Sequence, residues 1–131
     1  MKSGGDNLVN KHNKILGNFG EDAACRHLEN KDYDIIARNY RFRGGEIDII
    51  AERDNTLVFV EVKTRQTSEF GEPAEAVDLR KLEKIALVVE FYLANNDWSG
   101  EVRVDVIEVF GKLERGRFMM SDINHIENII S

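Results

Sequence analysis

Two short apolar segments on either side of a polar turn constrain the fold of this chain more than any other feature. "EIDIIA" (46–51) and "LVFVEVK" (57–63) are rich in β-branched residues and alternate in the manner of strands. Between them, Asp54 and Asn55 both tolerate the positive φ that a two-residue turn requires. The sequence therefore predicts a β-hairpin in which the numbers of opposite residues sum to 109.

Four charged side chains interrupt this hairpin, namely Glu46, Asp48, Glu61 and Lys63. The predicted register places Asp48 opposite Glu61 and Glu46 opposite Lys63, all on one face, which is apolar nearer the turn. Opposed carboxylates repel each other unless a cation neutralises them, and a hard divalent cation such as Mg²⁺ prefers carboxylate oxygens. The quartet predicts a metal site, where Lys63 orients an attacking water or stabilises charge on a phosphate.

A structural interpretation of the same four charges stays open. An acid followed by Glu-x-Lys is a loose pattern, and the chain has a second Glu-x-Lys at Glu29–Lys31, near the end of a predicted helix. Glu46 and Lys63 also suit a simple cross-strand ion pair worth a few tenths of a kcal/mol. In that case the charges belong to a solvated end of the hairpin.

The remaining periodicity predicts one α/β domain at 12–131 after a flexible tail at 1–11. The 131 residues, 42% of them apolar, suffice for one hydrophobic core. Besides the hairpin, the predicted elements are a helix (12–29), a strand (33–38), a loop with Pro73 (66–76), a helix beginning at an Asp78 cap (78–96), a strand (101–110), its hairpin partner (116–120) and a short helix (122–130). This order predicts a mixed sheet flanked by helices on both faces.

The two long helices have apolar stripes that predict their buried faces. The stripes are Ile15, Leu16, Phe19, Ala23, Ala24 and Leu28 in the first helix, and Leu82, Ile85, Ala86, Val89 and Leu93 in the second. Glu21 shares the side of the first helix on which Gly17, Ala24, Cys25 and Leu28 lie. An acid there suits a further metal or water ligand, with Gly17 and Gly20 allowing close approach of the backbone; a carboxylate reaching solvent from the stripe's edge is the alternative.

The basic residues are too few to attract nucleic acid by net charge, because the formal charge is −6. A local basic rim is still expected around the carboxylates, since "RNYRFRGG" (38–45) combines arginines with aromatic residues. Its candidate contacts are Arg38, Arg41, Arg43, Arg65 and Lys81. A solvated surface is the alternative for these charges. The histidines, His12, His27 and His125, show no metal-ligand spacing.

The sequence gives no sign of a membrane or secretory protein. It has no apolar run long enough to span a bilayer and no signal-peptide core in its first residues. The single cysteine, Cys25, has no partner for an internal disulfide. We therefore expect a cytoplasmic protein.

The motifs together resemble a known family. "GEDAACRHL", "GEIDIIA", "VFVEVKTR", "FGEPAEAV" and "KLEKIALVVEFYL" occur in the order typical of the YraN-like uncharacterised protein family, and the resemblance covers about residues 14–110. That family is similar in fold to restriction endonucleases and archaeal Holliday junction resolvases, the Asp…Glu-x-Lys nuclease superfamily. The resemblance implies a restriction-endonuclease-like three-layer sandwich, with a mixed β-sheet between helices.

The resemblance also implies roles for single residues. Asp48, Glu61 and the backbone carbonyl of Val62 correspond to the metal ligands, Lys63 to the superfamily's lysine, and Glu21 to the helical glutamate of the resolvases. Ile47 stands where many superfamily members have proline. The implied function is Mg²⁺- or Mn²⁺-dependent hydrolysis of phosphodiester bonds in DNA or RNA. The resemblance to resolvases, which often dimerise, also suggests a homodimer. The alternative is a non-catalytic module that keeps the nuclease fold to bind nucleic acid or a protein.

Overall fold

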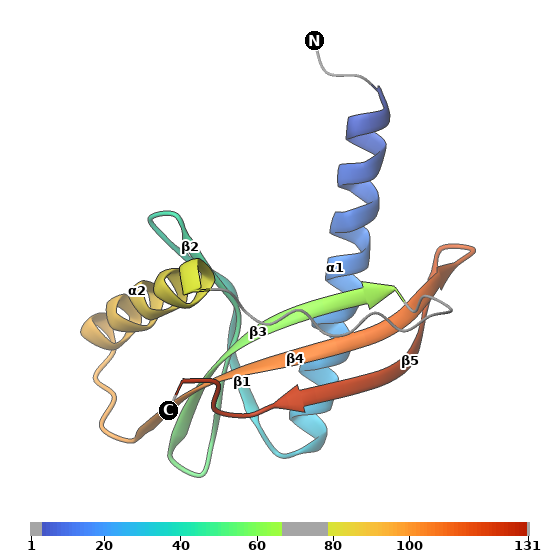
Figure 1. The fold of residues 1–131 in the computed structure, drawn as a ribbon. Helices are drawn as coiled ribbons and strands as arrows, with labels where there is room; N and C mark the ends of the chain where they lie inside the picture. Colours follow the sequence, from blue (N-terminus) through green and yellow to red (C-terminus); the bar gives the residue numbers. More distant parts are fainter. Residues whose placement is uncertain (1–3, 67–78, 131) are drawn as a thin grey trace.

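The computed structural model of the chain describes residues 4–66 and 79–130, with side chains from Lys11 onward except those of Asn13 and Leu79. Its helices and strands are α1 (Gly4–Asn30), β1 (Asp34–Phe42), β2 (Gly45–Arg53), β3 (Thr56–Gln66), α2 (Leu79–Asn95), β4 (Glu101–Glu114) and β5 (Arg117–Ile126), as Figure 1 shows. The predicted loop with Pro73 and the Asp78 cap lie outside the described residues.

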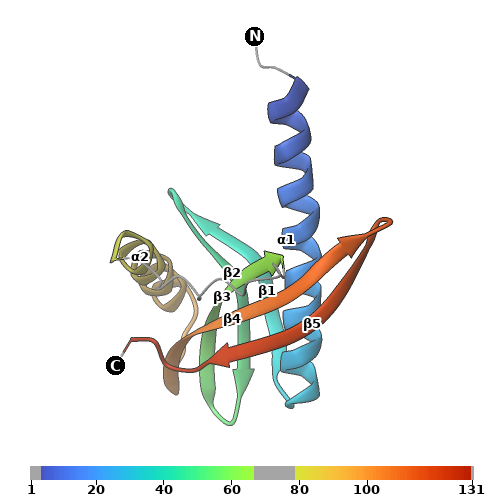
Figure 2. The same cartoon turned by 45° about the vertical axis from the view of Figure 1, so that its right-hand side comes forward.

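The five described strands form one mixed sheet in the order β1-β2-β3-β4-β5. β3 and β4 are parallel, and the other neighbouring pairs are antiparallel. α1 packs against one face and α2 against the other, near the β1–β2 end of the sheet (Figures 1 and 2). This confirms the predicted α/β class and the mixed sheet flanked by helices.

The central strand β3 serves both hydrophobic cores, because its side chains alternate between the faces. Val58 and Val60 join the cluster under α1, which also contains the buried Cys25. Leu57 and Phe59 join the cluster under α2. This alternation is the one predicted from the sequence, and it points Glu61 towards the α2 face of the sheet.

Three tight turns connect the antiparallel strands. Asp54 and Asn55, at φ 51° and 59°, form the predicted turn between β2 and β3. Arg43–Gly44 (φ 32° and 78°) and Arg115–Gly116 (φ 51° and 75°) join the other two hairpins, and both residues of each pair again have positive φ. Paired left-handed residues match the right-handed twist of the strands, which makes each hairpin compact.

The first helix is longer than expected. It begins at Gly4 rather than at residue 12, so it takes in much of the segment predicted as a tail. Extending a helix that is already packed costs little compared with nucleating it. It ends at Asn30, where the amides of Asp32 and Tyr33 bond to the carbonyls of the last turn and Asp32 adopts φ 66°.

The predicted short helix at 122–130 is wrong, because residues 122–126 belong to a strand and residues 127–130 form no helix. β5 continues to Ile126 and pairs with β4 there, opposite Val106. Ile123, Ile126 and Ile130 have helical spacing, but three residues are a weak signal, and pairing with β4 satisfies the backbone groups of an extended chain. β1 is likewise longer than predicted and continues to Phe42.

The predicted helix stripes are correct in most positions. Ile15 and Ala86 are exposed, contrary to prediction, whereas Val88 is fully buried on α2 and was not predicted. Ile47 also differs, because it joins the α2 cluster while Ile49 joins the α1 cluster. Before Ile49, β2 is paired with β1 alone, so the strand is free to twist there.

Within the described residues, neither helix is long and apolar enough to cross a membrane.

Candidate functional site

The predicted site lies where β2 and β3 separate. Their ladder follows the predicted register from the turn as far as Ile49 opposite Val60, and it stops before Asp48 and Glu61. The Asp48 side chain bridges the gap, because its Oδ2 accepts a 2.7 Å hydrogen bond from the backbone N–H of Val62. The expected direct opposition of Asp48 and Glu61 is thus replaced by a side-chain link across the opening strands.

Asp48 is in an environment that disfavours its charged form. Burial raises its pKa, and the negative charge of Glu61 raises it further, to about 7. The hydrogen bond from Val62 lowers the pKa, while Glu21 and Glu46 raise it slightly. The predicted acids therefore do gather around Asp48, and their negative charge helps to hold its pKa well above the usual value for an aspartate.

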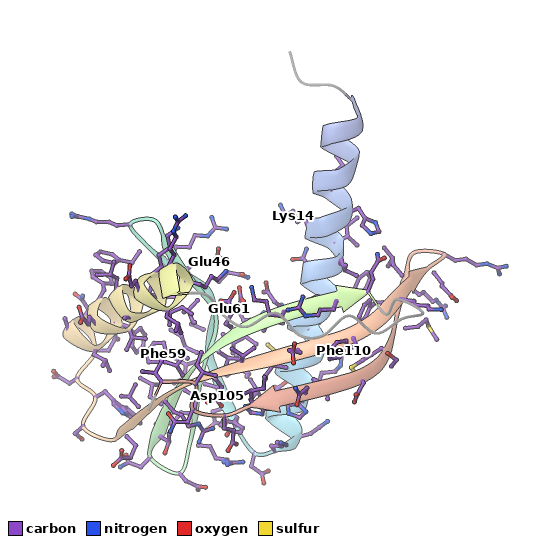
Figure 3. All side chains as sticks on the ribbon, viewed as in Figure 1. Lys14, Glu46, Phe59, Glu61, Asp105 and Phe110 are labelled. Carbon is purple, nitrogen blue, oxygen red and sulfur yellow. The ribbon has the colours of Figure 1, made fainter. Side chains whose placement is uncertain are left out.

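Glu61 is the most buried acid of the group, with a side chain only 5% exposed. Its Oε1 lies 2.8 Å from Lys81 Nζ and 4.0 Å from Lys63 Nζ. Figure 3 shows Glu61 on β3, in the region between the start of α2 and α1. The hydrogen bond from Lys81 to this carboxylate raises the pKa of the lysine, although burial acts in the opposite direction. Lys81 was expected in the basic rim, and here it lies inside the site.

Close packing of α1 on β3 brings Glu21 to the same place. A Cβ atom at Gly20 would overlap the Thr64 hydroxyl and come within 2.8 Å of the Thr64 Cβ, so only glycine fits. The predicted role of Gly20 is confirmed, whereas a Cβ atom at Gly17 would have no described atom within 4 Å, so the packing does not require glycine there. Glu21 Oε1 is buried and accepts no hydrogen bond from the described residues, and Arg38 Nη2 lies 3.5 Å away.

A cavity of about 230 Å³ connects Glu21 with the β3 residues of the site. Its lining consists of Leu16, Gly17, Glu21, Val62, Lys63 and Thr64. A buried carboxylate oxygen without a hydrogen bond beside such a space is suited to a water or a cation. The oxygen donors of Asp48, Glu61 and Glu21 are also of the type that Mg²⁺ and Mn²⁺ prefer.

The predicted carboxylates surround this region without closing on one point. Among the described residues, only Asp105, His125 and Glu127 offer three acidic or imidazole ligand atoms within 4.8 Å of one another. A cation held by two carboxylates must therefore complete its shell with water or backbone oxygen, which is usual for Mg²⁺.

The basic residues around the site are partly engaged in ion pairs. Arg38 lies 2.9 Å from Asp22 as well as near Glu21. Arg65 lies 3.4 Å from the buried Glu108, which makes it part of the sheet rather than of an exposed rim. Arg38 and Arg65 are thus already paired with the acids Asp22 and Glu108.

The tip of the β1–β2 hairpin is the more open basic region. Arg41 is 76% exposed, and its Nε lies 3.6 Å from Glu46, so Glu46 pairs with Arg41 instead of the expected Lys63. Arg43 lies over the ring of Phe42, at 5.8 Å from its centroid. An arginine beside an aromatic ring at an exposed tip retains hydrogen-bond donors for an incoming ligand.

A second polar cluster, on β4 and β5, was not predicted. Asp105 is fully buried and accepts hydrogen bonds from Arg103 and from the Asn128 backbone N–H, while His125 Nε2 lies 2.7 Å from its Oδ2. His125 Nδ1 in turn lies 3.2 Å from His27 Nε2 on α1. The one signal in the sequence is an Arg-x-Asp pair inside an apolar strand, because the histidines meet only through the fold.

Comparison with known proteins finds related sequences over most of the chain. The model of the uncharacterised protein family UPF0102 matches residues 20–109. A UPF0102 protein of Caldanaerobacter subterraneus is 41% identical over 121 residues, covering 92% of this chain and 96% of the relative. A UPF0102 protein of Alkaliphilus oremlandii is 47% identical over 121 residues, covering 88% and 97%, and one of Clostridioides difficile is 41% identical over 118 residues, covering 89% and 97%.

Proposed function

Because this chain belongs to the uncharacterised protein family UPF0102, which confirms the resemblance found in its motifs, we propose a function from the site itself. The protein is a Mg²⁺- or Mn²⁺-dependent nuclease that hydrolyses phosphodiester bonds in DNA or RNA. The observation that carries this proposal is the arrangement of Asp48 and Glu61 at the point where β2 and β3 separate.

Both carboxylates are placed there at a cost to the fold. Asp48 is held across the gap by the Val62 N–H, and Glu61 is almost fully buried beside it. A purely structural position would favour residues that do not repel each other. A carboxylate whose pKa is raised by burial and by a neighbouring acid, as in Asp48, is typical of sites that bind a cation or carry out acid–base chemistry.

The proposed roles follow from these positions. Asp48 and Glu61 hold the metal, with the Val62 carbonyl as a further ligand and Glu21 binding a water of its shell. A bound divalent cation supplies an activated water and neutralises charge at the phosphate. The ammonium of Lys63, 4.0 Å from Glu61 Oε1, is positioned to orient that water and to stabilise developing negative charge.

The substrate surface is provided by parts of the chain that extend past the sheet. Figures 1 and 2 show the β1–β2 hairpin and the N-terminal half of α1 projecting in the same general direction. Arg41 and Arg43 at the hairpin tip contact phosphates, and both lie near the metal-binding end of β2. The net charge of −6 limits long-range attraction, so we expect affinity to fall steeply with salt and to depend on Mg²⁺ or Mn²⁺.

A cleavage assay tests the proposal. Single strands, flaps and four-way junctions of DNA and RNA are incubated with the full-length protein, with and without Mn²⁺. Cleavage is expected only with metal, and Asp48→Asn or Lys63→Ala should lower its rate by about a hundredfold or more. Asp97→Asn and Lys112→Ala, which remove the same charges at exposed positions, serve as controls. Metal-dependent cleavage that survives in Asp48→Asn would refute the assignment.

A second candidate function is a non-catalytic module that binds nucleic acid or a protein. It is favoured by one observation, that Lys81 and Lys63 already neutralise Glu61 without a metal. This candidate predicts no heat on titration with Mn²⁺, and binding of nucleic acid that is unchanged in Asp48→Asn but weaker in Arg41→Ala. Calorimetric binding of Mn²⁺ at millimolar or tighter affinity would exclude it.

A further inference from the structure

Glu61 already binds a cation supplied by the protein. Lys81 Nζ lies 2.8 Å from Glu61 Oε1, within hydrogen-bond distance, while Lys63 Nζ lies 4.0 Å from the same oxygen. A carboxylate oxygen that accepts a close hydrogen bond from an ammonium has less free lone-pair density for a metal. The position of Lys81 therefore bears directly on how a divalent cation reaches Glu61.

We infer that Lys81 and a divalent cation compete for the Glu61 carboxylate, and that metal binding releases the Lys81 ammonium to contact the substrate phosphate. The inference rests on the proposed function in one respect, namely that Glu61 is a metal ligand. It adds a switch between two partners of Lys81. Without metal, the Lys81 ammonium neutralises the buried Glu61 carboxylate; with metal bound, the same ammonium becomes an additional cation for the phosphate.

Lys81 is better placed than Lys63 to leave. A divalent cation bound to Glu61 repels both ammonium groups, so the one in direct contact must move farthest. Lys81 is 43% exposed on the first turn of α2, and its flexible stem can turn towards solvent without disturbing the sheet. Lys63 is 30% exposed, projects from the central strand β3 and is already 4.0 Å away.

The location of Lys81 also favours a phosphate as its next partner. α2 begins at Leu79, and its first turn contains no acid but has Arg80 and Lys81. Positive side chains at a helix N-terminus oppose the helix dipole, and an anion there relieves the conflict. In the metal-free protein Glu61 is that anion, and in the metal-bound complex the phosphate takes its place.

Three variants of the full-length protein test the competition by calorimetric titration with Mn²⁺. Lys81→Met removes the competing ammonium, Lys81→Arg keeps a charge at the same position, and Lys84→Met removes an exposed charge one turn further along α2. We expect Lys81→Met to bind Mn²⁺ on the order of fivefold more tightly than the wild type. Lys81→Arg and Lys84→Met should remain within about twofold of it. Thermal unfolding of each variant checks that it is folded.

A second measurement tests the release towards substrate. At saturating Mn²⁺, Lys81→Met should raise the KM for cleavage several-fold, whereas Lys84→Met should not. Tighter metal binding together with a weaker substrate interaction is not expected from a lysine whose only role is structural.

The outcomes separate this inference from the proposed function. Equal Mn²⁺ affinity in the wild type and Lys81→Met, with metal-dependent cleavage intact, overturns the competition and leaves the nuclease standing. Tighter binding in Lys81→Met without cleavage of any substrate supports the competition and overturns the nuclease. An absence of Mn²⁺ binding in the wild type and in Lys81→Met overturns both. An unchanged KM in Lys81→Met overturns the contact with phosphate.

Discussion

Asp48 and Asp105 are acids on the same sheet with opposite surroundings. Asp105 is fully buried, and each of its carboxylate oxygens is engaged, by Arg103 and the Asn128 N–H on one side and by Arg103 and His125 on the other. Burial alone would raise the pKa of Asp105, but these three partners lower it below the usual value. The carboxylate of Asp48 has the Val62 N–H and is otherwise near other acids, so its pKa rises to about 7.

The difference is the one expected between a structural acid, Asp105, and the metal ligand that we propose for Asp48. A buried charge with a complete set of donors holds its neighbours in place, and removing it leaves those neighbours unpaired. A buried acid with too few donors weakens the fold, and it persists in a protein where another partner compensates. Four predictions test this contrast.

Removing the Asp105 carboxylate should have the largest effect on stability. In Asp105→Ala the guanidinium of Arg103 and the ring of His125 lose their shared acceptor inside the fold. We expect the free energy of unfolding to fall by about 3–5 kcal/mol, measured by urea denaturation at neutral pH. Asp97→Ala, at an exposed position, should change it by less than about 0.5 kcal/mol. A loss below about 1 kcal/mol in Asp105→Ala would contradict the structural role.

The ionised carboxylate of Asp48, unlike that of Asp105, should destabilise the fold, and this effect should depend on pH. Its pKa is about 7 in the folded protein and about 3.9 when unfolded, so the folded state binds the proton more tightly. Its contribution to stability is present below pH 4 and is lost as pH rises through about 7.

Relative to Asp48→Asn, which resembles the protonated acid, the wild type should therefore lose about 1–2 kcal/mol between pH 5 and pH 8 in buffer with chelator. Urea denaturation of both proteins at the two pH values measures this change. A constant difference between them would mean that Asp48 is as well partnered as Asp105.

How much of this contrast was visible in the sequence depends on how local each interaction is. Strand alternation and the Asp54–Asn55 turn determine the hairpin register, so the grouping of Asp48 and Glu61 was predictable. The point at which the β2–β3 ladder ends was not predictable. Before Ile49, β2 pairs only with β1, and after Val60, β3 pairs only with β4. That choice depends on partners elsewhere in the sheet.

The second polar cluster shows the same limit more strongly. His27 and His125 are 98 residues apart and meet only because the end of α1 packs beside β5. Their spacing in the sequence gives no sign of this contact. Lys81 was recognised as basic, yet its approach to Glu61 depends on how α2 docks against the sheet. Local patterns thus predicted the unusual residues of the β2–β3 hairpin, while tertiary packing determined their partners and assembled the second cluster.

Metal should stabilise the region of Asp48 and leave that of Asp105 unaffected. A ligand at ten times its Kd adds about 1.4 kcal/mol to the free energy of unfolding. We expect Mn²⁺ at that excess to raise the Tm of the wild type and of His125→Asn by similar amounts, and not to raise that of Asp48→Asn. Thermal unfolding followed by circular dichroism measures the shifts. If Mn²⁺ raises the Tm of Asp48→Asn as much as that of the wild type, or does not raise the Tm of His125→Asn, the metal does not bind at Asp48 as proposed.

The smallest expected effect concerns His27, at the outer end of the Asp105 cluster. Burial lowers the pKa of His27, and the positive charge of Lys31 and contact with His125 lower it further. The unfolded chain therefore binds the proton more readily, and the wild type should lose stability as pH falls below about 6.5, the ordinary histidine value. Compared with His27→Gln, which removes this titration, the loss between pH 7.5 and pH 5 should be under about 1 kcal/mol. His12→Gln, at an exposed histidine, should keep the wild-type dependence. If the stability of His27→Gln also falls as much as that of the wild type between pH 7.5 and pH 5, His27 does not contribute to the Asp105 cluster. The cluster then ends at His125, and Asp105 differs from Asp48 by fewer partners than the contacts indicate.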